Sequence, residues 1–390
     1  MMNRLVSACG VFTLGLFLTL TLSGCGGVSA NPRPTPTPTP MPTPPGATPT
    51  PTPAAAHGTF IFVNGDFSSG EPTDGYRLNA DGTLTLISGS PFPVSGGLAA
   101  SGGFLMVSTG STLTSYKVDP ATGVPTKAAS VAAGGSSAIA ADTKNVYVAG
   151  VTADNANNII SGFSVASSGV LTPVSGSPYV FSPTCLFCDQ PVSLAVNNNF
   201  LAVGGVGFHS VGDFTVYPRS SSGVLGKPQA LGVDEQGDVA IQHPTGNAAF
   251  AIDGSLGAIN SYHIDSTGKP VAAGNGQLLT GNFMDEVVDA TGKFLLVADL
   301  SGVVNVFTID SATANISQIG TSESTGSGAR LIAIDPSGRF VIVAQSSFLG
   351  SPPAPDQITV FSFDPATGAM KKLQSYPVGK APGRITIVSE

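Results

Sequence analysis

Two arginines occupy matching positions near the C-terminus, and their side chains are suited to hold an anion. Arg330 stands in the stretch ARLIAI and Arg384 in GRITIV, which share one pattern of apolar residues. A guanidinium binds a carboxylate or a phosphate through two parallel hydrogen bonds. In a second interpretation, both arginines pair with Asp285, Glu286 or a neighbouring acid and line a water-filled channel. The sequence leaves both interpretations open.

Carboxylates and one histidine are the candidates for proton transfer. Glu286 and Asp238 precede apolar stretches much as the two arginines do, and His209 is placed to reach the mouth of a pocket. Oxygen-rich segments can also bind Ca²⁺, but the D-x-D-x-D-G spacing is absent. We therefore expect a solvated acidic rim, with no metal and no other cofactor. Its members are Asp234, Glu235, Asp238, Asp253, Asp285, Glu286 and Asp299.

The pair Cys185 and Cys188 has three interpretations. In an exported protein the two thiols should pair as a local disulfide. A zinc site would need two further ligands, and none has suitable spacing. A thioredoxin-like redox role would need a βαβ context, which the pattern lacks. The disulfide is the interpretation we favour.

The elements that position these residues are short strands in repeated units. Residues 329–378 predict four strands in a row, separated by turn signals such as PSG at 336–338 and DPATG at 364–368. In the latter, Asp caps the turn, Pro presets φ and Gly takes the left-handed position. Such a unit cannot bury both faces of its sheet alone, so neighbouring copies must stack against it.

Seven copies of the unit follow one another. Their second strands place apolar residues at spacings of 44, 41, 55, 48, 46 and 46, which are typical of propeller blades. The aligned residues are Val63, Val107, Val148, Val203, Ala251, Val297 and Val343. We therefore predict an all-β fold: a seven-bladed β-propeller of four-stranded antiparallel blades. The first copy lacks a strand, so residues 385–388 should complete the N-terminal blade as its innermost strand and close the ring.

Composition limits the partners. The chain of 390 residues has a formal net charge of −8, only 10% charged residues and no Trp. Binding of nucleic acid requires clustered Lys and Arg, which are absent, so we expect no nucleic-acid partner. We expect a soluble, exported monomer that binds a small anionic ligand or a protein.

The N-terminus predicts export and lipid attachment. A basic start and a short apolar run at residues 11–22 indicate a signal peptide over 1–24, too short to span a bilayer. The following LSGC resembles the bacterial lipobox, which implies that Cys25 is acylated and anchors the protein in the lipid bilayer. The alternative is an ordinary secretory signal with an incidental Cys. By resemblance to lipoprotein sorting, Gly26 rather than Asp after the Cys implies the outer membrane in a cell that has one, on its periplasmic face or at the cell surface.

Residues 25–57 connect the anchor to the ring at 58–390. Eleven of the 24 residues at 31–54 are Pro, many alternating with Thr. Proline favours polyproline II, so this segment should be a stiff spacer of about 3.1 Å per residue.

The seven blades, the DPxTG turns and the DPSGRF and HPTGN segments resemble the seven-bladed lactonase-like propellers. That family includes the 6-phosphogluconolactonases of this fold and the muconate-lactonizing enzymes, whose Arg, His and Glu residues lie at the inner ends of first strands. The matching positions here are Ser193, Asp238, Glu286, Arg330 and Arg384.

The resemblance implies a pocket at the ring centre, but the His of the family pattern is missing from these positions. Opening a lactone requires a base for water and cations for the oxyanion. Arg330 and Arg384 would supply the cations, and Glu286, Asp238 or His209 the base. Because the His is absent, we expect first a binding or scaffold module that acts through one face of the ring. A lactonase-like hydrolase is the alternative.

Overall fold

The computed structural model of the chain describes the residues that form the ring. These are residues 58–65, 70–135, 138–183, 190–206, 214–230, 239–244, 246–253, 257–273, 277–278, 282–326, 328–346, 356–379 and 381–389. They belong to one compact unit, Pro53–Glu390. Within these ranges, no helix is long and apolar enough to cross a membrane.

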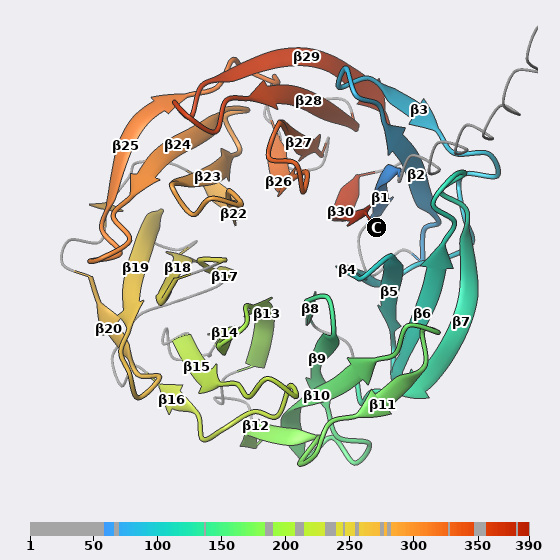
Figure 1. The fold of residues 1–390 in the computed structure, drawn as a ribbon, viewed down its shortest axis with the longest axis vertical. Helices are drawn as coiled ribbons and strands as arrows, with labels where there is room; N and C mark the ends of the chain where they lie inside the picture. The colour runs from blue at the N-terminus through green and yellow to red at the C-terminus, as the bar shows by residue number, and fades with distance from the viewer. Residues whose placement is uncertain are drawn as a thin grey trace, which may run out of the picture. The chain divides into compact units, whose positions relative to one another are not determined.

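Seven antiparallel sheets are arranged as the blades of a propeller, as predicted (Figure 1). Blade one contains β30 (Pro382–Ser389), β1 (Thr59–Gly65), β2 (Thr73–Leu78) and β3 (Leu84–Leu86). Blade two contains β4 (Gly97–Ser101), β5 (Phe104–Thr109), β6 (Thr112–Val118) and β7 (Pro125–Ala132). Blade three contains β8 (Ala138–Ala141), β9 (Asn145–Val151), β10 (Asn157–Val165), β11 (Leu171–Pro173) and β12 (Tyr179–Pro183).

The remaining blades follow in chain order. Blade four contains β13 (Gln190–Val196), β14 (Phe200–Val206), β15 (Phe214–Pro218) and β16 (Gln229–Ala230). Blade five contains β17 (Val239–Gln242), β18 (Ala248–Asp253), β19 (Ala258–Ile264), β20 (Pro270–Ala272) and β21 (Gln277–Leu278). Blade six contains β22 (Phe283–Val288), β23 (Phe294–Asp299), β24 (Val304–Ile309) and β25 (Ile316–Thr321). Blade seven contains β26 (Ala329–Ile334), β27 (Phe340–Gln345), β28 (Gln357–Phe363) and β29 (Met370–Pro377).

The blades depart from the expected four strands in two places. In blades three and five the outermost strand is followed by a further short strand, so that β12 also pairs with β10 and β21 also pairs with β19. The third strand of each of these blades therefore has two successive partners on its outer side.

The C-terminal strand closes the ring, as the sequence predicted. β30 pairs antiparallel with β1, and Phe60 lies opposite Val388. Blade one is thus built from both ends of the ring-forming segment, and β30 takes the innermost position (Figure 1). This pairing removes the open inner edge that β1 would otherwise present.

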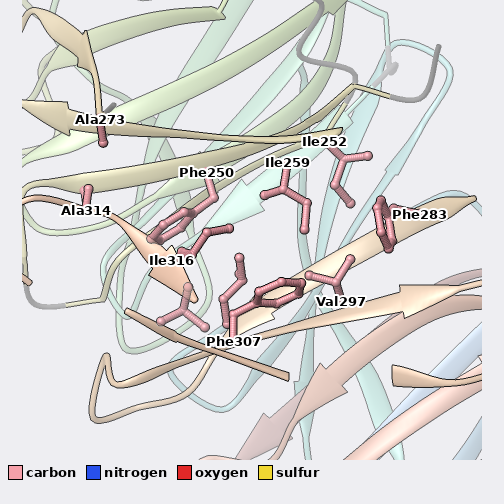
Figure 2. Close-up of a cluster of buried hydrophobic side chains, with 12 residues drawn as sticks. Phe250, Ile252, Ile259, Ala273, Phe283, Val297, Phe307, Ala314 and Ile316 are labelled. Atoms are coloured by element: carbon pink, nitrogen blue, oxygen red, sulfur yellow. The ribbon is translucent and has the colours of Figure 1, made fainter. Parts of the chain in front are cut away.

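The apolar core is divided among the interfaces between blades. Seven clusters of buried side chains are found, and each joins two neighbouring blades. Between blades five and six, Phe250 and Ile259 face Phe283, Val297 and Phe307 (Figure 2). Each fully buried side chain of this size contributes about 1.5–3 kcal/mol to stability.

The continuous apolar runs in the sequence form the second strand of each blade, which is buried on both faces. Side chains alternate between the two faces of a strand. In β23, Leu295 and Val297 therefore pack toward blade five, whereas Phe294 and Leu296 pack toward blade seven. A strand buried on both faces needs apolar residues at every position, which gives the run FLLV.

Consecutive turns of each blade lie on opposite faces of the ring. We call the face that carries the turns between first and second strands, and between third and fourth strands, the turn face. Its turns have the predicted chemistry: Asp119 accepts backbone N–H groups of Ala121 at 3.0 Å and Thr122 at 2.7 Å, and Gly123 has a φ of 79°. The opposite face, where the blades are linked and where first strands begin, is the loop face.

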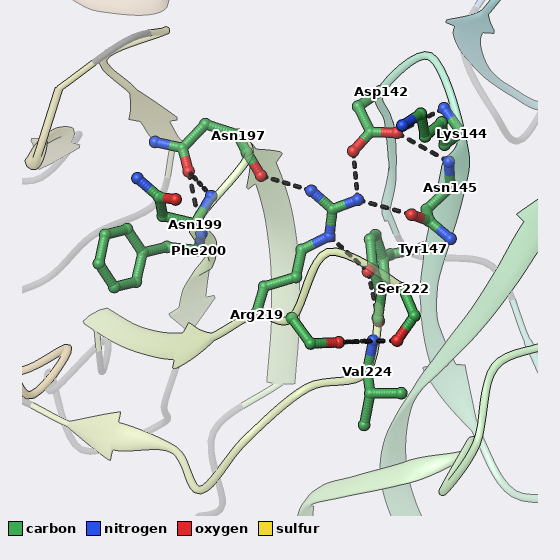
Figure 3. A network of polar contacts seen from close by, with 12 residues as sticks. Asp142, Lys144, Asn145, Tyr147, Asn197, Asn199, Phe200, Arg219, Ser222 and Val224 are labelled. Carbon is green, nitrogen blue, oxygen red and sulfur yellow. Dashed lines mark hydrogen bonds and ion pairs between the residues drawn. The ribbon is translucent and has the colours of Figure 1, made fainter.

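A buried arginine that the sequence analysis did not single out joins blades three and four on the turn face. The side chain of Arg219 is 3% exposed and forms an ion pair with Asp142. It also donates to the Tyr147 hydroxyl at 2.8 Å, the Asn145 side-chain oxygen at 2.6 Å and the Asn197 carbonyl at 2.6 Å (Figure 3). A planar guanidinium serves four acceptors at once, which a lysine cannot do.

Replacing Arg219 should therefore strongly destabilise the folded chain. We expect Arg219→Ala to lower the free energy of unfolding by about 3–5 kcal/mol, because Asp142 and three other acceptors lose their donor. Lys144 is exposed and lies in the same turn as Asp142. Lys144→Ala should therefore change the free energy of unfolding by less than about 0.5 kcal/mol. Urea unfolding of the full chain measures both values. Similar small losses for both variants would contradict a structural role for Arg219.

Candidate functional site

A cavity of about 240 Å³ lies at the centre of the ring. Its walls are the innermost strands of blades three, four, six, seven and one. They are lined by Ala138, Ile139, Val192, Ser193, Leu194, Met284, Asp285, Leu331, Arg384 and Ile385. Ligand pockets for drug-sized molecules usually measure about 300–1,000 Å³, so this cavity suits a smaller ligand.

Four of the innermost strands contain a one-residue bulge near their start, at the loop face. The residue without a direct partner is Val192 in β13, Met284 in β22, Arg330 in β26 and Gly383 in β30. A bulge re-aims the side chains that follow it. The residues directly after the four bulges all line the cavity: Ser193, Asp285, Leu331 and Arg384.

Two neighbouring carboxylates follow the bulge in β22. The sequence analysis aligned Glu286 with Ser193 and Arg384, whereas the bulge at Met284 gives that place to Asp285. Asp285 lies opposite Ala298, on the face toward blade seven. Glu286 lies opposite Val297, on the face toward blade five. Consecutive side chains of a strand lie on opposite faces, and the one-residue shift at Met284 decides which of the two carboxylates faces blade seven.

The two arginines meet at the bulge of β30. Arg384 lines the cavity and donates from Nη1 to the Gly383 carbonyl at 2.8 Å. Arg330 reaches across from blade seven and donates from Nη1 to the Pro382 carbonyl at 3.2 Å. Both positive charges are close enough to Asp285 to oppose the rise of its pKa.

Asp285 is half-buried in the cavity wall, and one of its carboxylate oxygens accepts the backbone N–H of Ile332 at 2.9 Å. Burial raises the pKa of Asp285 to about 6, against the lowering effect of that hydrogen bond, of Arg384 and of Arg330. At neutral pH the group is ionised, yet its pKa is close enough to neutrality for proton exchange with a substrate.

Glu286 has a different environment. It is 4% exposed, and neither carboxyl oxygen has a hydrogen-bond partner among the described residues. Burial raises the pKa of Glu286 well above its usual value, and the nearby Asp285 raises it further. A neutral, protonated side chain is the form that such a site favours.

Several predicted site residues lie outside the described residues. They are Cys25, Cys185, Cys188, His209 and Asp238, together with Asp234 and Glu235 of the expected acidic rim. Of the other histidines, His243 is buried in a turn and contacts the Gly292 carbonyl through Nε2 at 2.9 Å, a contact between blades five and six that gives it a structural role. In the part of the chain that the structure describes, no group of three or more His, Cys, Asp or Glu side chains could hold a metal ion.

Chemically, the cavity combines the Asp285 carboxylate with the Arg384 guanidinium, and the Arg330 guanidinium beside it is close enough to act on Asp285. A carboxylate with a raised pKa can take a proton from water, and guanidinium groups can stabilise an oxyanion. Most of the other lining residues have apolar side chains. From the sequence, Asp285 was expected only as an ion-pair partner and as a member of the acidic rim, and the bulge is what brings it to the cavity.

The environment of Asp285 predicts a pH-dependent stability difference. Because the folded chain holds the Asp285 proton more tightly, wild-type stability decreases as pH rises from about 4 to about 6. Asp285→Asn removes this cost, so the variant should gain on the order of 2–3 kcal/mol relative to wild type across that window. Urea unfolding at several pH values measures the difference.

A second carboxylate provides a control of opposite sign. Hydrogen bonds from Thr122 and Ala121 lower the pKa of Asp119. Asp119→Asn should therefore lose stability relative to wild type as pH rises to about 4. If the difference between Asp285→Asn and wild type did not vary with pH, the burial of Asp285 would be contradicted.

Part of the chain matches a known protein family. Residues 286–387 match the family model described as lactonase, 7-bladed beta-propeller. No curated protein sequence matches the chain.

Solved structures extend the likeness to the whole ring. A Bacteroides fragilis protein, provisionally named a 6-phosphogluconolactonase, is 18% identical with a TM-score of 0.67, over 87% of this chain and 100% of its own. The periplasmic gluconolactonase PpgL of Pseudomonas aeruginosa is 18% identical with a TM-score of 0.63, over 85% and 99%. A Lactobacillus plantarum protein is 18% identical with a TM-score of 0.65, over 85% and 99%. The expected resemblance is confirmed: residues 286–387 carry the sequence pattern of the lactonase-type seven-bladed propellers, and the ring shares their fold.

Proposed function

We propose that the chain is a lactonase-type hydrolase that opens a small lactone in the central cavity. The observation that carries the proposal is that the Asp285 carboxylate and the Arg384 guanidinium line one cavity, with the Arg330 guanidinium close enough to act on Asp285. The match of residues 286–387 to a lactonase family supports it. Two of the compared proteins are named as lactonases, which agrees with the same reaction class. These comparisons favour the hydrolase over the scaffold module that the sequence analysis placed first.

The reaction begins with water held by Asp285. The Asp285 carboxylate takes a proton from the water while the water oxygen attacks the lactone carbonyl carbon. This attack forms a tetrahedral oxyanion. The ring C–O bond then breaks, and the leaving alkoxide takes the proton back from Asp285. The products are a carboxylate and a hydroxyl on one open chain, and the proton of the new acid passes to solvent.

The arginines stabilise the negative charge that develops on the carbonyl oxygen. Donors fixed before the reaction stabilise such an oxyanion without reorganising. Arg384 is held by the Gly383 carbonyl and Arg330 by the Pro382 carbonyl, so both are anchored to one backbone segment. The same cations attract the carboxylate product and any anionic group on the substrate.

Loss of activity in two variants tests the proposal. With δ-gluconolactone and aliphatic lactones as substrates of the full chain, Arg384→Ala should lower kcat about 10²–10³-fold. Asp285→Asn should lower it about 10²–10⁴-fold, and wild-type kcat/KM should rise with pH and level off above about 6. Lys371→Ala, exposed on the outer strand β29, should leave kcat unchanged. Spontaneous hydrolysis is subtracted in each assay. Equal turnover in all four proteins would overturn the assignment.

We further propose that the hydrolase is exported and held at the cell envelope through acylated Cys25. The lipobox-like LSGC and the Pro/Thr-rich segment support this. Cys25→Ala should move the protein from the membrane to the soluble fraction, because two or more acyl chains are needed for stable anchoring. Cys9→Ala, within the signal peptide, should leave it on the membrane. Sedimentation of Cys25→Ala with membranes would contradict lipid attachment.

A further inference from the structure

A second cavity lies on the turn face, where blades seven and one meet. It measures about 400 Å³ and is separate from the central cavity. Its walls are the start of β1, the end of β2 and the first turn of blade seven. The lining residues are Gly58, Thr59, Arg77, Leu78, Asn79, Ala80, Asp335, Ser337, Arg339 and Phe340. We call it the seam cavity.

Two guanidinium groups line the seam cavity without a carboxylate partner. Arg77 is half-buried, lies over the Phe60 ring at 5.7 Å and donates from Nη1 to the Ala121 carbonyl at 2.7 Å. Arg339 is exposed and lies over the Phe340 ring at 5.1 Å. Its side-chain hydrogen bonds are long, from Nε to the Ser337 hydroxyl and from Nη2 to the Ala80 carbonyl, both at 3.4 Å. Within the described ranges, no ion pair involves either arginine. Each guanidinium has five N–H donors, so most remain available.

The carboxylate in the wall of the seam cavity, that of Asp335, already accepts hydrogen bonds within its own turn. The buried carboxylate of Asp335 accepts the backbone N–H of Ser337 at 3.0 Å, Arg339 at 2.9 Å and Phe340 at 2.6 Å. It also accepts the Ser337 hydroxyl. Asp81, in the neighbouring turn, accepts the backbone N–H and hydroxyl of Thr83. Neither carboxylate forms an ion pair with the two arginines.

The corresponding place between blades three and four shows how this differs from a structural arginine. There, Arg219 and Asp142 line a cavity of about 370 Å³, but they form an ion pair and Arg219 is 3% exposed. Four acceptors surround the Arg219 guanidinium (Figure 3). At the seam, by contrast, two guanidinium groups share one cavity and their charges are not neutralised by an ion pair. Two such guanidinium groups favour the binding of an oxyanion that accepts hydrogen bonds from both.

We propose that the seam cavity is a phosphate-binding site. The phosphate accepts hydrogen bonds from Arg77 and Arg339, and the exposed Ser337 hydroxyl lies at the same wall. The central cavity is lined near the loop-face ends of the first strands, whereas this site lies on the turn face and shares no lining residue with it, so it does not serve the lactonase reaction. Gly58 lines it, and there the N-terminal segment joins the ring. The phosphate is either that of a free metabolite or that of an anionic lipid headgroup.

Calorimetric titration of the full chain with inorganic phosphate, at low ionic strength, tests the site. We expect Arg77→Gln and Arg339→Gln each to weaken binding about tenfold, which corresponds to the loss of one charge-assisted contact. Lys293→Gln is the matched control, because Lys293 occupies in blade six the position that Arg339 occupies in blade seven. It removes the same charge from the same face and should change the affinity less than about twofold.

Vesicles distinguish the two sources of phosphate. The full chain with Cys25→Ala, which lacks the acylation site, is sedimented with phosphatidylglycerol or phosphatidylcholine vesicles. Binding to phosphatidylglycerol that both arginine variants lose identifies a lipid headgroup. Phosphate binding without vesicle binding identifies a soluble ligand. Absence of phosphate binding, or equal binding by wild type and both arginine variants, would overturn the site. Unchanged lactone turnover in Arg339→Gln separates this outcome from failure of the proposed reaction.

Discussion

The structure depends on one packing constraint: no blade can bury the two faces of its own sheet. Each of the seven apolar clusters takes side chains from two neighbouring blades, so every interface needs both partners. The last interface forms only if blade seven meets a complete blade one. β30 satisfies this requirement, because Ile385 and Ile387 pack against the cluster shared with blade seven, whereas Val388 joins the cluster shared with blade two. One strand therefore stabilises two interfaces and also seals the ring.

The same constraint places the chemistry at the centre. First strands are innermost, and their starting ends converge at the loop face, so residues far apart in the chain come together there (Figure 1). Ser193, Asp285 and Arg384 meet in this way. Arg330 and Arg384 share the Pro382–Gly383 segment, so the strand that closes the ring also anchors both cations. The pairing of β30 with β1 therefore closes the ring and also fixes the backbone segment that holds both arginines.

Much of the fold followed from the sequence, because apolar runs and turn residues report local requirements. The seven copies, the Asp-capped turns and the closing role of residues 385–388 were all predicted and are confirmed. The site was less accessible. Bulges leave no clear mark in the sequence, and an alignment of Glu286 with Arg384 assumed a regular strand. Arg219 was also missed, since its partners Asp142 and Asn197 come from different blades and only tertiary packing unites them.

The bulge at Met284 decides which of two consecutive carboxylates can act on a ligand. Asp285 faces two guanidinium groups and a backbone N–H, so its charge is partly compensated in the cavity wall. Glu286 faces the apolar interface with blade five, where an ionised carboxylate would have no partner among the described residues. Opposite environments therefore give the neighbours different protonation states at neutral pH. If β22 continued from Phe283 as a regular strand, Asp285 would lie opposite Val297, on the face toward blade five, and Glu286 would lie on the face toward blade seven. The irregularity in β22 is therefore what gives the cavity its base.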